Sequence, residues 1–575
     1  MARRSFQPYV PHEVLFEMTQ TVPIAERAAA AIVARLAVVA VVAIVSPSAF
    51  AQAGQSPDPS FIFVPPAGGG ANDRFGTSLA SIDDRIAIGS PQRPFTLNGV
   101  THNAQGAVSI FRELAAGYVM EASLVVVDGK ANDFTGTAVD MVGDWVVAGA
   151  PGKDNKVLSL PLPNQLQSGG VFAWSFQAGS WVGPTLLIHP APRSNDLFGS
   201  ALAMHREVLG DGTLRQTLVV AAPTDDGPIP TGGSRPDCGS VTIWELEANA
   251  WVQKAFIEMP VLEGETYLKT AGALFGTSVR IEGKFLFVGA KRASPTTTSQ
   301  GAFFVFRRSS ESDPAPVVLA TDPAVNPAWG EWTLTQRIVA EAPEAYDQFG
   351  TSIDAQQDKV IVGAPNRRKD SMSNTGAAYI YSRNPQNDQF EWEASLFAAD
   401  AQTGDLFGAA VAIWSDQAAI GAPGVDIGSI PTQVVDRGTV YLYSTDPDTC
   451  TGWTQNTEYA PPTDLATPDS NFGSALRIDV AQILIGAPRA PGPNGFQQGS
   501  TLAYPIDTVG CAYDLDGDGL VNGFDLALFF SHWGGSTPDH FVADYDGNHI
   551  VDGTDMSYAL SNWGPCGCDG SAPAP

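Results

Sequence analysis

Short apolar runs, many of them alternating with polar residues, follow one another along most of this chain and predict β-strands rather than helices. Residues 347–381 show the pattern, with an alternating run after Gly350, an apolar run over 359–365 and a third run over 376–381. Alternation with a period of two is typical of strands that bury one face. Glycine and proline, 58 and 43 of 575 residues, supply the turns that many short strands need, so we expect a mainly β protein.

The strand pattern repeats seven times, and each repeat is bounded by two short motifs. The first is a phenylalanine–glycine pair that opens an alternating run, and its glycines are Gly76, Gly136, Gly199, Gly276, Gly350, Gly408 and Gly473. The second closes the next apolar run, as Gly89-Ser90-Pro91, Gly149-Ala150-Pro151, Ala221-Ala222-Pro223, Gly289-Ala290-Lys291, Gly363-Ala364-Pro365, Gly421-Ala422-Pro423 and Gly486-Ala487-Pro488. Thr135 replaces the phenylalanine of the second repeat, and Lys291 replaces the proline of the fourth. The spacings of 58 to 77 residues are too long for helical-hairpin repeats and indicate one repeated supersecondary unit.

A fourth, outer run follows in six repeats and is usually opened by a tryptophan: Trp181, Trp251, Trp332, Trp392 and Trp453, with Tyr118 in the first repeat. The seventh repeat ends at Tyr504 without such a run. Phe61 to Val64 read as a strand with no partner strand before it, and this segment leads into Phe75-Gly76 as residues 186–188 lead into Phe198-Gly199. We therefore expect the first strand of the chain to complete the seventh repeat.

The motif pair, its order and the number of repeats resemble the FG-GAP repeat family, which includes the head domains of integrin α subunits. The resemblance covers residues 61 to about 505 and implies a seven-bladed β-propeller. Four strands per unit agree with this fold, because one such unit cannot bury both faces alone and radial stacking of neighbours builds a shared core.

An aspartate stands three residues before the opening glycine in five repeats, as Asp73, Asp133, Asp196, Asp347 and Asp405. These aspartates could form a ring of carboxylates for a metal or cationic ligand, or each could cap a turn by accepting a backbone N–H. Ala273 and Ser470 hold the position in the other two repeats, which favours the turn role.

The propeller region carries no motif to which we assign a metal or a catalytic residue. Integrin blades bind calcium through loops of the type D-x-D-x-D-G, and residues 61–505 lack that pattern. His102, His189 and His205 stand at non-equivalent positions, and no G-x-S-x-G or H-E-x-x-H motif is present. The many carboxylates leave a glycosidase-type pair open without specifying one.

An export signal is predicted at the N-terminus, over residues 1–51. Leu36 to Val45 form a ten-residue apolar run with Arg27 and Arg35 before it and Ala49-Phe50-Ala51 after it. Ten residues are too few to span a bilayer, and small residues after an apolar run are typical of signal cleavage. We therefore expect no membrane span in the mature chain, which would be secreted or held at the cell surface.

The formal net charge of −29 works against binding to nucleic acid or to an anionic membrane. The five cysteines, Cys238, Cys450, Cys511, Cys566 and Cys568, are disulfide candidates in an exported protein, and their odd number leaves at least one unpaired.

Beyond residue 508 a duplicated loop–helix pattern replaces the strand repeats. The first loop places oxygen ligands and one backbone carbonyl at calcium-loop spacing, and the second repeats this thirty residues later; the ligands are Asp514, Asp516, Asp518, Leu520, Asn522, Asp525, Asp544, Asp546, Asn548, Ile550, Asp552 and Asp555. Gly519 provides the sharp turn of the first loop, whereas His549 stands at that position in the second. Each loop leads into a predicted helix, with Leu526, Phe529, Phe530, Met556, Tyr558 and Leu560 as packing residues.

Two calcium loops, each followed by one helix, resemble a type I dockerin module. The resemblance implies Ca²⁺ as cofactor and a cohesin-like protein partner, often in polysaccharide breakdown. Partner choice in that family depends on loop positions 10 and 11, here Gly523-Phe524 and Gly553-Thr554 rather than the familiar Ser-Thr pair. A calcium-stabilised cap with no partner is the alternative. Because the ends of a pseudo-twofold module should meet, we also expect a disulfide from Cys511 to Cys566 or Cys568.

The sequence thus predicts a secreted binding or scaffold protein, with a protein or carbohydrate ligand on the propeller. The alternative is an extracellular carbohydrate-active hydrolase with its site on a propeller face. Translation could start at Met1 or Met18. The expected divisions are a signal peptide 1–51, a linker 52–60, a propeller 61–507, a dockerin-like module 508–568 and a disordered tail 569–575.

Overall fold

The computed structural model divides the chain into two units, Met1–Gln55 and Ser56–Pro575. It describes residues 57–66, 69–82, 84–114, 117–155, 166–209, 213–229, 233–309, 329–414, 416–426, 434–445, 452–463, 465–479, 482–493 and 495–506, and in the C-terminal region 520, 521, 523, 526, 529, 530, 533, 551, 553–561, 564 and 565. The predicted signal peptide, four of the five cysteines and the predicted tail lie outside these residues. Within them, no helix is long and apolar enough to cross a membrane.

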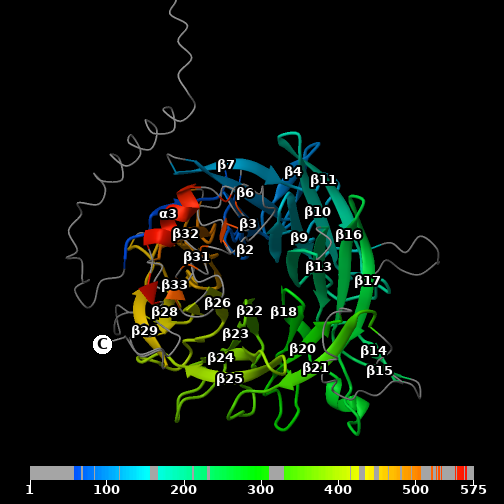
Figure 1. The fold of residues 1–575 in the computed structure, drawn as a ribbon. Coiled ribbons are helices and arrows are strands. Elements are labelled where there is room, and N and C mark those ends of the chain that lie inside the picture. Colours follow the sequence, from blue (N-terminus) through cyan, green and yellow to red (C-terminus); the bar gives the residue numbers. More distant parts are fainter. Residues whose placement is uncertain are drawn as a thin grey trace, which may run out of the picture. The chain divides into compact units, whose positions relative to one another are not determined.

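Seven four-stranded antiparallel sheets form a ring, which confirms the predicted seven-bladed propeller (Figure 1). From the inner to the outer strand, blade 1 is β2 (Leu79–Ile82), β3 (Arg85–Ser90), β6 (Ala107–Leu114) and β7 (Gly117–Leu124); blade 2 is β8 (Val139–Val142), β9 (Trp145–Ala150), β10 (Gly170–Gln177) and β11 (Ser180–Leu187); blade 3 is β12 (Ala201–Val208), β13 (Leu214–Ala222), β16 (Ser240–Glu247) and β17 (Ala250–Glu258); blade 4 is β18 (Phe275–Glu282), β19 (Phe285–Ala290), β20 (Ala302–Arg308) and β21 (Trp332–Ile338).

Blades 5 to 7 repeat the same order. Blade 5 is β22 (Ser352–Gln356), β23 (Lys359–Ala364), β24 (Ala377–Asn384) and β25 (Gln389–Leu396); blade 6 is β26 (Ala410–Trp414), β27 (Gln417–Ala422), β28 (Thr439–Thr445) and β29 (Trp453–Tyr459); blade 7 is β30 (Ala475–Ile478), β31 (Gln482–Ala487), β32 (Ser500–Pro505) and β1 (Phe61–Phe63). Two hairpins extend the loops between second and third strands, β4 (Phe95–Leu97) with β5 (Val100–His102) in blade 1 and β14 (Gly227–Pro228) with β15 (Ser234–Arg235) in blade 3.

The ring is closed by the first strand of the chain, as the sequence predicted. β1 pairs antiparallel with β32, with Phe61 opposite Ala503 and Phe63 opposite Thr501. Phe63 is fully buried and packs edge-on against Phe111 of blade 1. On the other side of the joint, the backbone N–H of Phe75 donates to the carbonyl of Gln498 at 2.9 Å, so the seventh blade is bonded to the first.

The two glycine motifs meet within a blade and between blades. In blade 5 the N–H of Gly350 donates to the carbonyl of Gly363 at 3.0 Å. Across the next interface, a Cβ on Gly363 would lie 2.0 Å from the carbonyl oxygen of Gly408 in blade 6. Only glycine permits so close an approach of two backbones. The repeated motifs are therefore the joints at which consecutive blades touch.

The joint between blades 3 and 4 differs because Ala221 replaces the closing glycine. The Ala221 methyl group reaches to 2.9 Å from where a Cβ on Gly276 would stand. The backbone of the fourth repeat is shifted, and β18 begins at Phe275 itself, which pairs with Ala290. In the other repeats the inner strand begins two to three residues after the glycine, so the expectation that the motif opens the strand holds only in blade 4.

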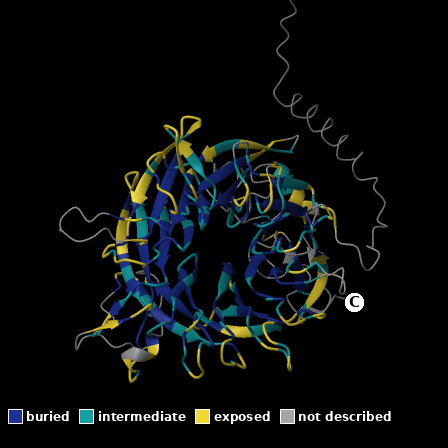
Figure 2. Ribbon diagram, turned by 180° about the vertical axis from the view of Figure 1, so that it is seen from behind, coloured by how far each residue is buried: buried dark blue, intermediate teal, exposed yellow. Residues whose placement is uncertain are grey.

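The core lies between the sheets, where the apolar faces of neighbouring blades pack together (Figure 2). At the interface of blades 4 and 5, Phe303 contacts Phe349 and Tyr381 with ring centroids 5.8 and 5.3 Å apart. Figure 2 shows exposed positions chiefly along the outer strands and connecting hairpins.

Tryptophans on outer strands help to join adjacent blades. Trp453 of β29 donates its indole N–H to Glu393 of β25 at 2.8 Å, and Lys359 pairs with the same carboxylate at 3.2 Å. Trp181 and Glu121 make the equivalent bond between blades 2 and 1 at 3.2 Å. Trp392 does not begin its strand as expected, because β25 starts at Gln389 and shifts register beside Trp392.

Candidate functional site

Most of the predicted calcium ligands lie outside the described residues. These are Asp514, Asp516, Asp518, Asn522, Asp525, Asp544, Asp546, Asn548, Ile550 and Asp552. Leu520 is the first residue of β33 (Leu520–Val521), and Asp555 lies buried in the first turn of α3 (Gly553–Ser561). Ca²⁺ binding at the two loops thus stays a prediction.

Among the described residues of this region, the second repeat contains a helix, α3, where the duplicated pattern predicts one. β33 pairs antiparallel with β34 (Gly564–Pro565), so the chain just after the second loop–helix repeat lies beside residues 520–521 of the first loop. α3 begins two residues before the predicted start at Asp555. Phe529 and Val551 are fully buried and pack with Leu526 and Met556, which confirms three of the predicted packing residues.

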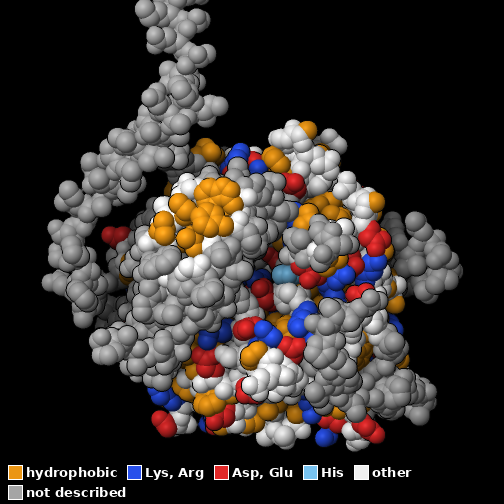
Figure 3. Space-filling view, viewed as in Figure 1, with side chains coloured by type: hydrophobic (Ala, Val, Ile, Leu, Met, Phe, Trp, Pro, Cys, Tyr) orange, Lys and Arg blue, Asp and Glu red, His pale blue; other side chains and the backbone are white. Residues whose placement is uncertain are grey.

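The other three predicted packing residues are about half exposed, and of these the Phe530 ring contacts that of Phe529 with centroids 5.8 Å apart. Phe530, Tyr558 and Leu560 are 49, 41 and 46% exposed, and Trp533 is 45% exposed. We call these four side chains the exposed apolar face. Figure 3 shows hydrophobic side chains gathered over this part of the molecule. The packing prediction was wrong for Tyr558 and Leu560, because the pattern could not separate the inner face of a short helix from its outer face.

The five repeat aspartates cap turns, which confirms the second interpretation of that pattern. Each carboxylate accepts the N–H of the residue three positions earlier, as Gly70 to Asp73 at 3.0 Å, Lys130 to Asp133 at 2.8 Å, Arg193 to Asp196 at 2.5 Å, Glu344 to Asp347 at 2.7 Å and Gln402 to Asp405 at 2.5 Å. All five side chains are buried, and burial raises the pKa of each.

A second position varies together with this aspartate. It lies two residues after the closing motif, and its backbone makes the same bonds in all seven repeats. Arg93, Lys153 and Arg367 occupy it in repeats 1, 2 and 5, where each cation offsets part of the rise that burial causes in the pKa of the neighbouring aspartate. Repeats 4 and 7, which lack the aspartate, have alanine there, and repeat 6 has Val425. In five of the seven repeats, therefore, the buried turn aspartate either has a basic side chain beside it or is absent.

Repeat 3 breaks the rule by placing a second carboxylate, Asp225, beside Asp196. His189 enters the same site from the segment after β11, where repeats 2, 5 and 6 have Val126, Ala340 and Ala398 at the same spacing before the aspartate. His189, Asp196 and Asp225 are 1, 2 and 1% exposed. We call these three residues the blade 3 cluster.

The imidazole of His189 lies between the two carboxylates. Its Nε2 is 3.5 Å from Asp225 Oδ2 and 3.3 Å from Ser240 Oγ, and its Nδ1 is 3.9 Å from Asp196 Oδ2. The N–H of Ala191 donates to Nδ1 at 3.3 Å, which places the ring proton on Nε2, toward Asp225. The rings of Phe198 and Phe256 pack edge-on against the imidazole.

Burial governs the ionisation of this cluster. It raises the pKa of Asp196 to about 7, with repulsion from Asp225 as a further cause. It also raises the pKa of Asp225 and lowers that of His189, while the two groups partly offset these shifts in each other. Arg193, half exposed at the rim, approaches Asp225 Oδ1 to 3.4 Å with Nη1.

A buried arginine fixes the loops beside the cluster. Arg235 of β15 donates to the carbonyls of Pro228 and Met259 at 3.2 and 2.8 Å and to Thr270 Oγ1 at 3.1 Å. Thr270 ends the short 3₁₀ helix η1 (Tyr267–Thr270). Cys238, the one described cysteine, is a buried free thiol here, so this disulfide candidate is excluded.

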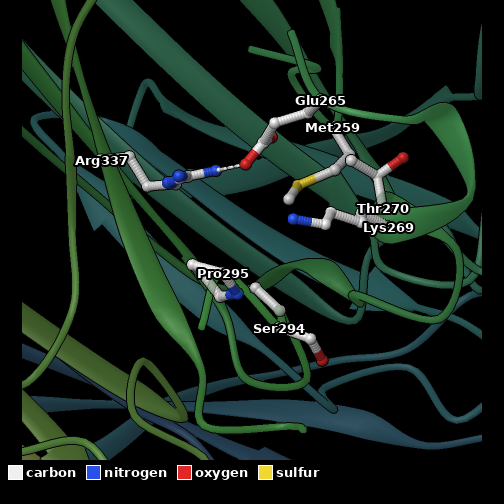
Figure 4. Close-up of a pocket in the computed structure, with 8 residues that line it drawn as sticks. Met259, Glu265, Lys269, Thr270, Ser294, Pro295 and Arg337 are labelled. Carbon is white, nitrogen blue, oxygen red and sulfur yellow. Dashed lines mark hydrogen bonds and ion pairs between the residues drawn. The ribbon is translucent and has the colours of Figure 1, made fainter. Parts of the chain in front are cut away.

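A small pocket opens next to these loops, between blades 3 and 4 (Figure 4). Met259, Lys269 and Pro295 line it, and Arg337 donates to Glu265 at 2.8 Å across its edge. Its volume of about 10 Å³ holds roughly one water molecule, too little for an organic ligand.

Sequence reasoning assigned no site to repeat 3, because His189 and Asp225 belong to no known short motif. The available signal was the alignment of the repeats with one another. It shows an acid at the position that holds a cation in three other repeats and a histidine at a position that is otherwise apolar.

The turn aspartates give the propeller a testable pH dependence. Burial raises the pKa of Asp405 to about 6, from about 3.9 for a free side chain, so the folded protein binds this proton at higher pH than the unfolded chain. Stability from this group should rise as pH falls from above 6 to below 4, by up to about 2–3 kcal/mol. Asp405→Asn keeps the carbonyl that caps the turn and removes the ionisation. The variant should therefore gain stability over the parent at pH 8 but not at pH 5, measured by urea unfolding.

Asp347→Asn is the matched control, because Arg367 pairs with that carboxylate at 2.8 Å. Burial also raises the pKa of Asp347, but Arg367 partly offsets this rise, so the stability of Asp347→Asn relative to the parent should change less between pH 8 and pH 5 than that of Asp405→Asn. A stability difference between parent and Asp405→Asn that does not change with pH would contradict the prediction.

Comparison with known proteins supports the repeat assignment. Residues 118–173, 332–381 and 390–443 match the FG-GAP repeat family. Each match begins in the outer strand of one blade and ends within the third strand of the next blade. The chain follows the same order at its start, where β1, the outer strand of blade 7, comes before blade 1. No curated protein sequence matches the chain.

Among solved structures, the chain resembles Sqt1 of Saccharomyces cerevisiae, with 9% identity over 79% of this chain and 100% of that one and a TM-score of 0.38. It also resembles the periplasmic gluconolactonase PpgL of Pseudomonas aeruginosa, at 11% identity over 67 and 85% of the two chains and a TM-score of 0.38. A third is a putative 6-phosphogluconolactonase of Bacteroides fragilis, at 10% identity over 67% of this chain and 84% of that one and a TM-score of 0.36. With TM-scores below 0.5, these likenesses carry no argument about function.

Proposed function

We propose that this protein, whose seven-bladed β-propeller is built from FG-GAP repeats, is a secreted binding or scaffold protein that attaches to a protein partner through its C-terminal module. The propeller is a rigid platform, because its blades are joined by backbone bonds and the ring is closed by β1. The apolar run followed by small residues at the N-terminus supports export.

The exposed apolar face is the observation that carries the attachment role. Phe530, Trp533, Tyr558 and Leu560 expose large apolar side chains on a small module that buries Phe529 and Val551 as its own core. Aromatic side chains are enriched among the residues that dominate binding energy at protein interfaces. A partner that covers this face would bury surface that is unfavourable in water.

Calcium would organise this face. We propose that Asp514, Asp516 and Asp518 with their loop partners bind one Ca²⁺ and that the loop from Asp544 to Asp555 binds a second. Carboxylates that converge in this way repel one another until a cation joins them, so ion binding and folding of the module are coupled. A cohesin-like partner fits the loop–helix duplication, while Gly523-Phe524 and Gly553-Thr554 predict a specificity different from that of Ser-Thr pairs.

A hydrolase with its site on the propeller is not favoured by the described residues. His189 and Ser240 lie 3.3 Å apart, as a nucleophile and its base would, but both are buried and no substrate could reach them. Of the carboxylates beside them, Asp196 caps a turn and Asp225 lies 3.4 Å from Arg193 Nη1 at the rim.

The attachment role is tested with the full mature chain as bait in the secreted proteins of its source. We expect one partner to be retained with Ca²⁺ and lost with a chelator. Phe530→Ala combined with Trp533→Ala should weaken capture about 100-fold or more, because residues of this kind each contribute on the order of 2 kcal/mol.

Trp392→Ala is the matched control, since Trp392 is an exposed tryptophan on an outer propeller strand. It should leave capture unchanged. Equal capture with and without calcium, or by the double variant and the parent, would count against the attachment role and leave the propeller platform to be tested separately.

A further inference from the structure

We propose that the blade 3 cluster, His189, Asp196 and Asp225, is a binding site for a divalent transition-metal cation of the Zn²⁺ class. This site is separate from the calcium loops and does not depend on the attachment role. It would bind the metal through one nitrogen and carboxylate oxygens, a ligand set found in zinc proteins.

The spacing of the donor atoms fits such an ion. Zinc lies about 2.0–2.2 Å from nitrogen and oxygen ligands, and at tetrahedral angles two ligands are then about 3.4 Å apart. His189 Nε2 is 3.5 Å from Asp225 Oδ2 and 3.3 Å from Ser240 Oγ. One ligand atom from each of His189, Asp196 and Asp225 lies within 4.8 Å of the others.

The charge of the site calls for a cation. Repeats 1, 2 and 5 place a basic side chain beside the turn aspartate, whereas repeat 3 places Asp225 there. Two buried carboxylates with oxygens within 4.8 Å of each other are costly unless a proton or a cation neutralises them. Arg193 approaches Asp225 Oδ1 from the rim of the site and also donates to the Asp226 carbonyl, while Asp225 Oδ2 lies 3.5 Å from the imidazole Nε2.

Metal binding would move one proton of the imidazole. Without metal, Nδ1 accepts the Ala191 N–H and the ring proton is on Nε2. A cation that binds Nε2 takes the place of that proton, which moves to Nδ1. Nδ1 then no longer accepts the Ala191 N–H and instead donates toward Asp196 Oδ2, now 3.9 Å away. A carboxylate that holds the second nitrogen of a ligating histidine is the common arrangement in zinc sites. Asp196 would thus orient the ring or, through its other oxygen, bind the ion.

The site would join two segments that are distant in sequence, the connection between β11 and β12 and the chain after β13. His189 follows β11, Asp196 belongs to the turn before β12, and Asp225 follows β13 and leads into the β14–β15 hairpin. A bound ion would therefore fix the loops of blade 3 on the side where that hairpin projects. The ligand set also predicts selectivity, since Ca²⁺ prefers six to eight oxygen ligands and does not favour imidazole.

The test compares the full mature chain with a variant that converts repeat 3 to the pattern of repeat 2. His189→Val with Asp225→Lys reproduces the trio Val126, Asp133 and Lys153, which is compatible with the fold. Each protein is dialysed against Zn²⁺ at pH 7.5 with excess Ca²⁺ to fill the calcium loops, and its metal content is measured. The parent should bind one more equivalent of zinc than the variant, and zinc should raise the melting temperature of the parent only.

Two further proteins keep the test decisive. Asp225→Asn, which keeps the shape of the side chain, should also fail to bind the additional equivalent of zinc, whereas Asp133→Asn in repeat 2 should still bind it. Equal zinc content in the parent, the double variant and Asp225→Asn would overturn the proposal and assign the cluster to proton binding. Co²⁺ added to the parent should give a visible absorption band that the double variant lacks.

Discussion

Gly363→Ala is expected to destabilise the propeller by at least about 3 kcal/mol, although it adds a single methyl group. The new Cβ would lie 2.0 Å from the carbonyl oxygen of Gly408 and 2.3 Å from Ser352 Oγ. Because Gly408 belongs to the next blade, the methyl group cannot be accommodated by a side-chain rotation and must push two blades apart. Chemical denaturation of the purified variant measures the loss.

Gly283→Ala is the matched control, since its Cβ would meet no atom within 4 Å. Its φ of +53° should limit the cost to about 1–2 kcal/mol. Repeat 3 indicates what an alanine at the closing position requires, since Ala221 occurs there together with a shifted start of β18. Similar unfolding curves for Gly363→Ala and Gly283→Ala would show that the joint between blades 5 and 6 is not tightly packed.

Deletion of residues 52–66 should lower the free energy of unfolding by about 4 kcal/mol or more and promote self-association. The deletion removes β1 and with it the burial of Phe63, and loss of one buried phenylalanine costs about 3–5 kcal/mol. It also exposes β32 as an open edge, which can pair with another chain. Thermal unfolding and light scattering would report the two effects.

Deletion of residues 52–59 provides the control, because it ends before β1. It should leave the melting curve nearly unchanged. Single substitutions sharpen the contrast, since Phe63→Ala should reproduce most of the loss while Val64→Ala, at a position 46% exposed, should not. Indistinguishable melting curves for the two deletions would mean that the seventh blade is stable with three strands.

The blades and their closure could be predicted from the sequence because each repeat is marked by glycines at fixed positions. Gly350 and Gly363 are required by a close backbone approach, so their spacing carries the geometry directly. The lack of a fourth run after Tyr504 and the unpaired run at Phe61 were likewise sufficient to place β1. Strand limits were less accurate, because a bulge such as the one beside Trp392 follows from neighbouring strands and leaves no trace in local alternation.

The candidate site was beyond the reach of sequence motifs for a different reason. Thirty-six residues separate His189 from Asp225, and the intervening chain forms two strands and a hydrogen-bonded turn before it returns. Their meeting depends on the equivalence of repeats, which a search for short motifs does not use. The calcium loops are the opposite case, since all their ligands lie within twelve consecutive residues.

The position of β1 has a consequence for the order in which the protein folds. A chain that emerges from its N-terminus releases β1 before every other propeller strand, but its partner β32 is the last propeller strand to emerge, and Ser60 bonds to Ala503 across 443 residues. Until synthesis or translocation is almost complete, β1 with its two phenylalanines has no native partner strand to pair with. Contacts of such long range slow folding and favour off-pathway pairing. The final step of propeller folding is therefore expected to be the pairing of β1 with β32, and the unpaired β1 is the segment to which a chaperone would most usefully bind.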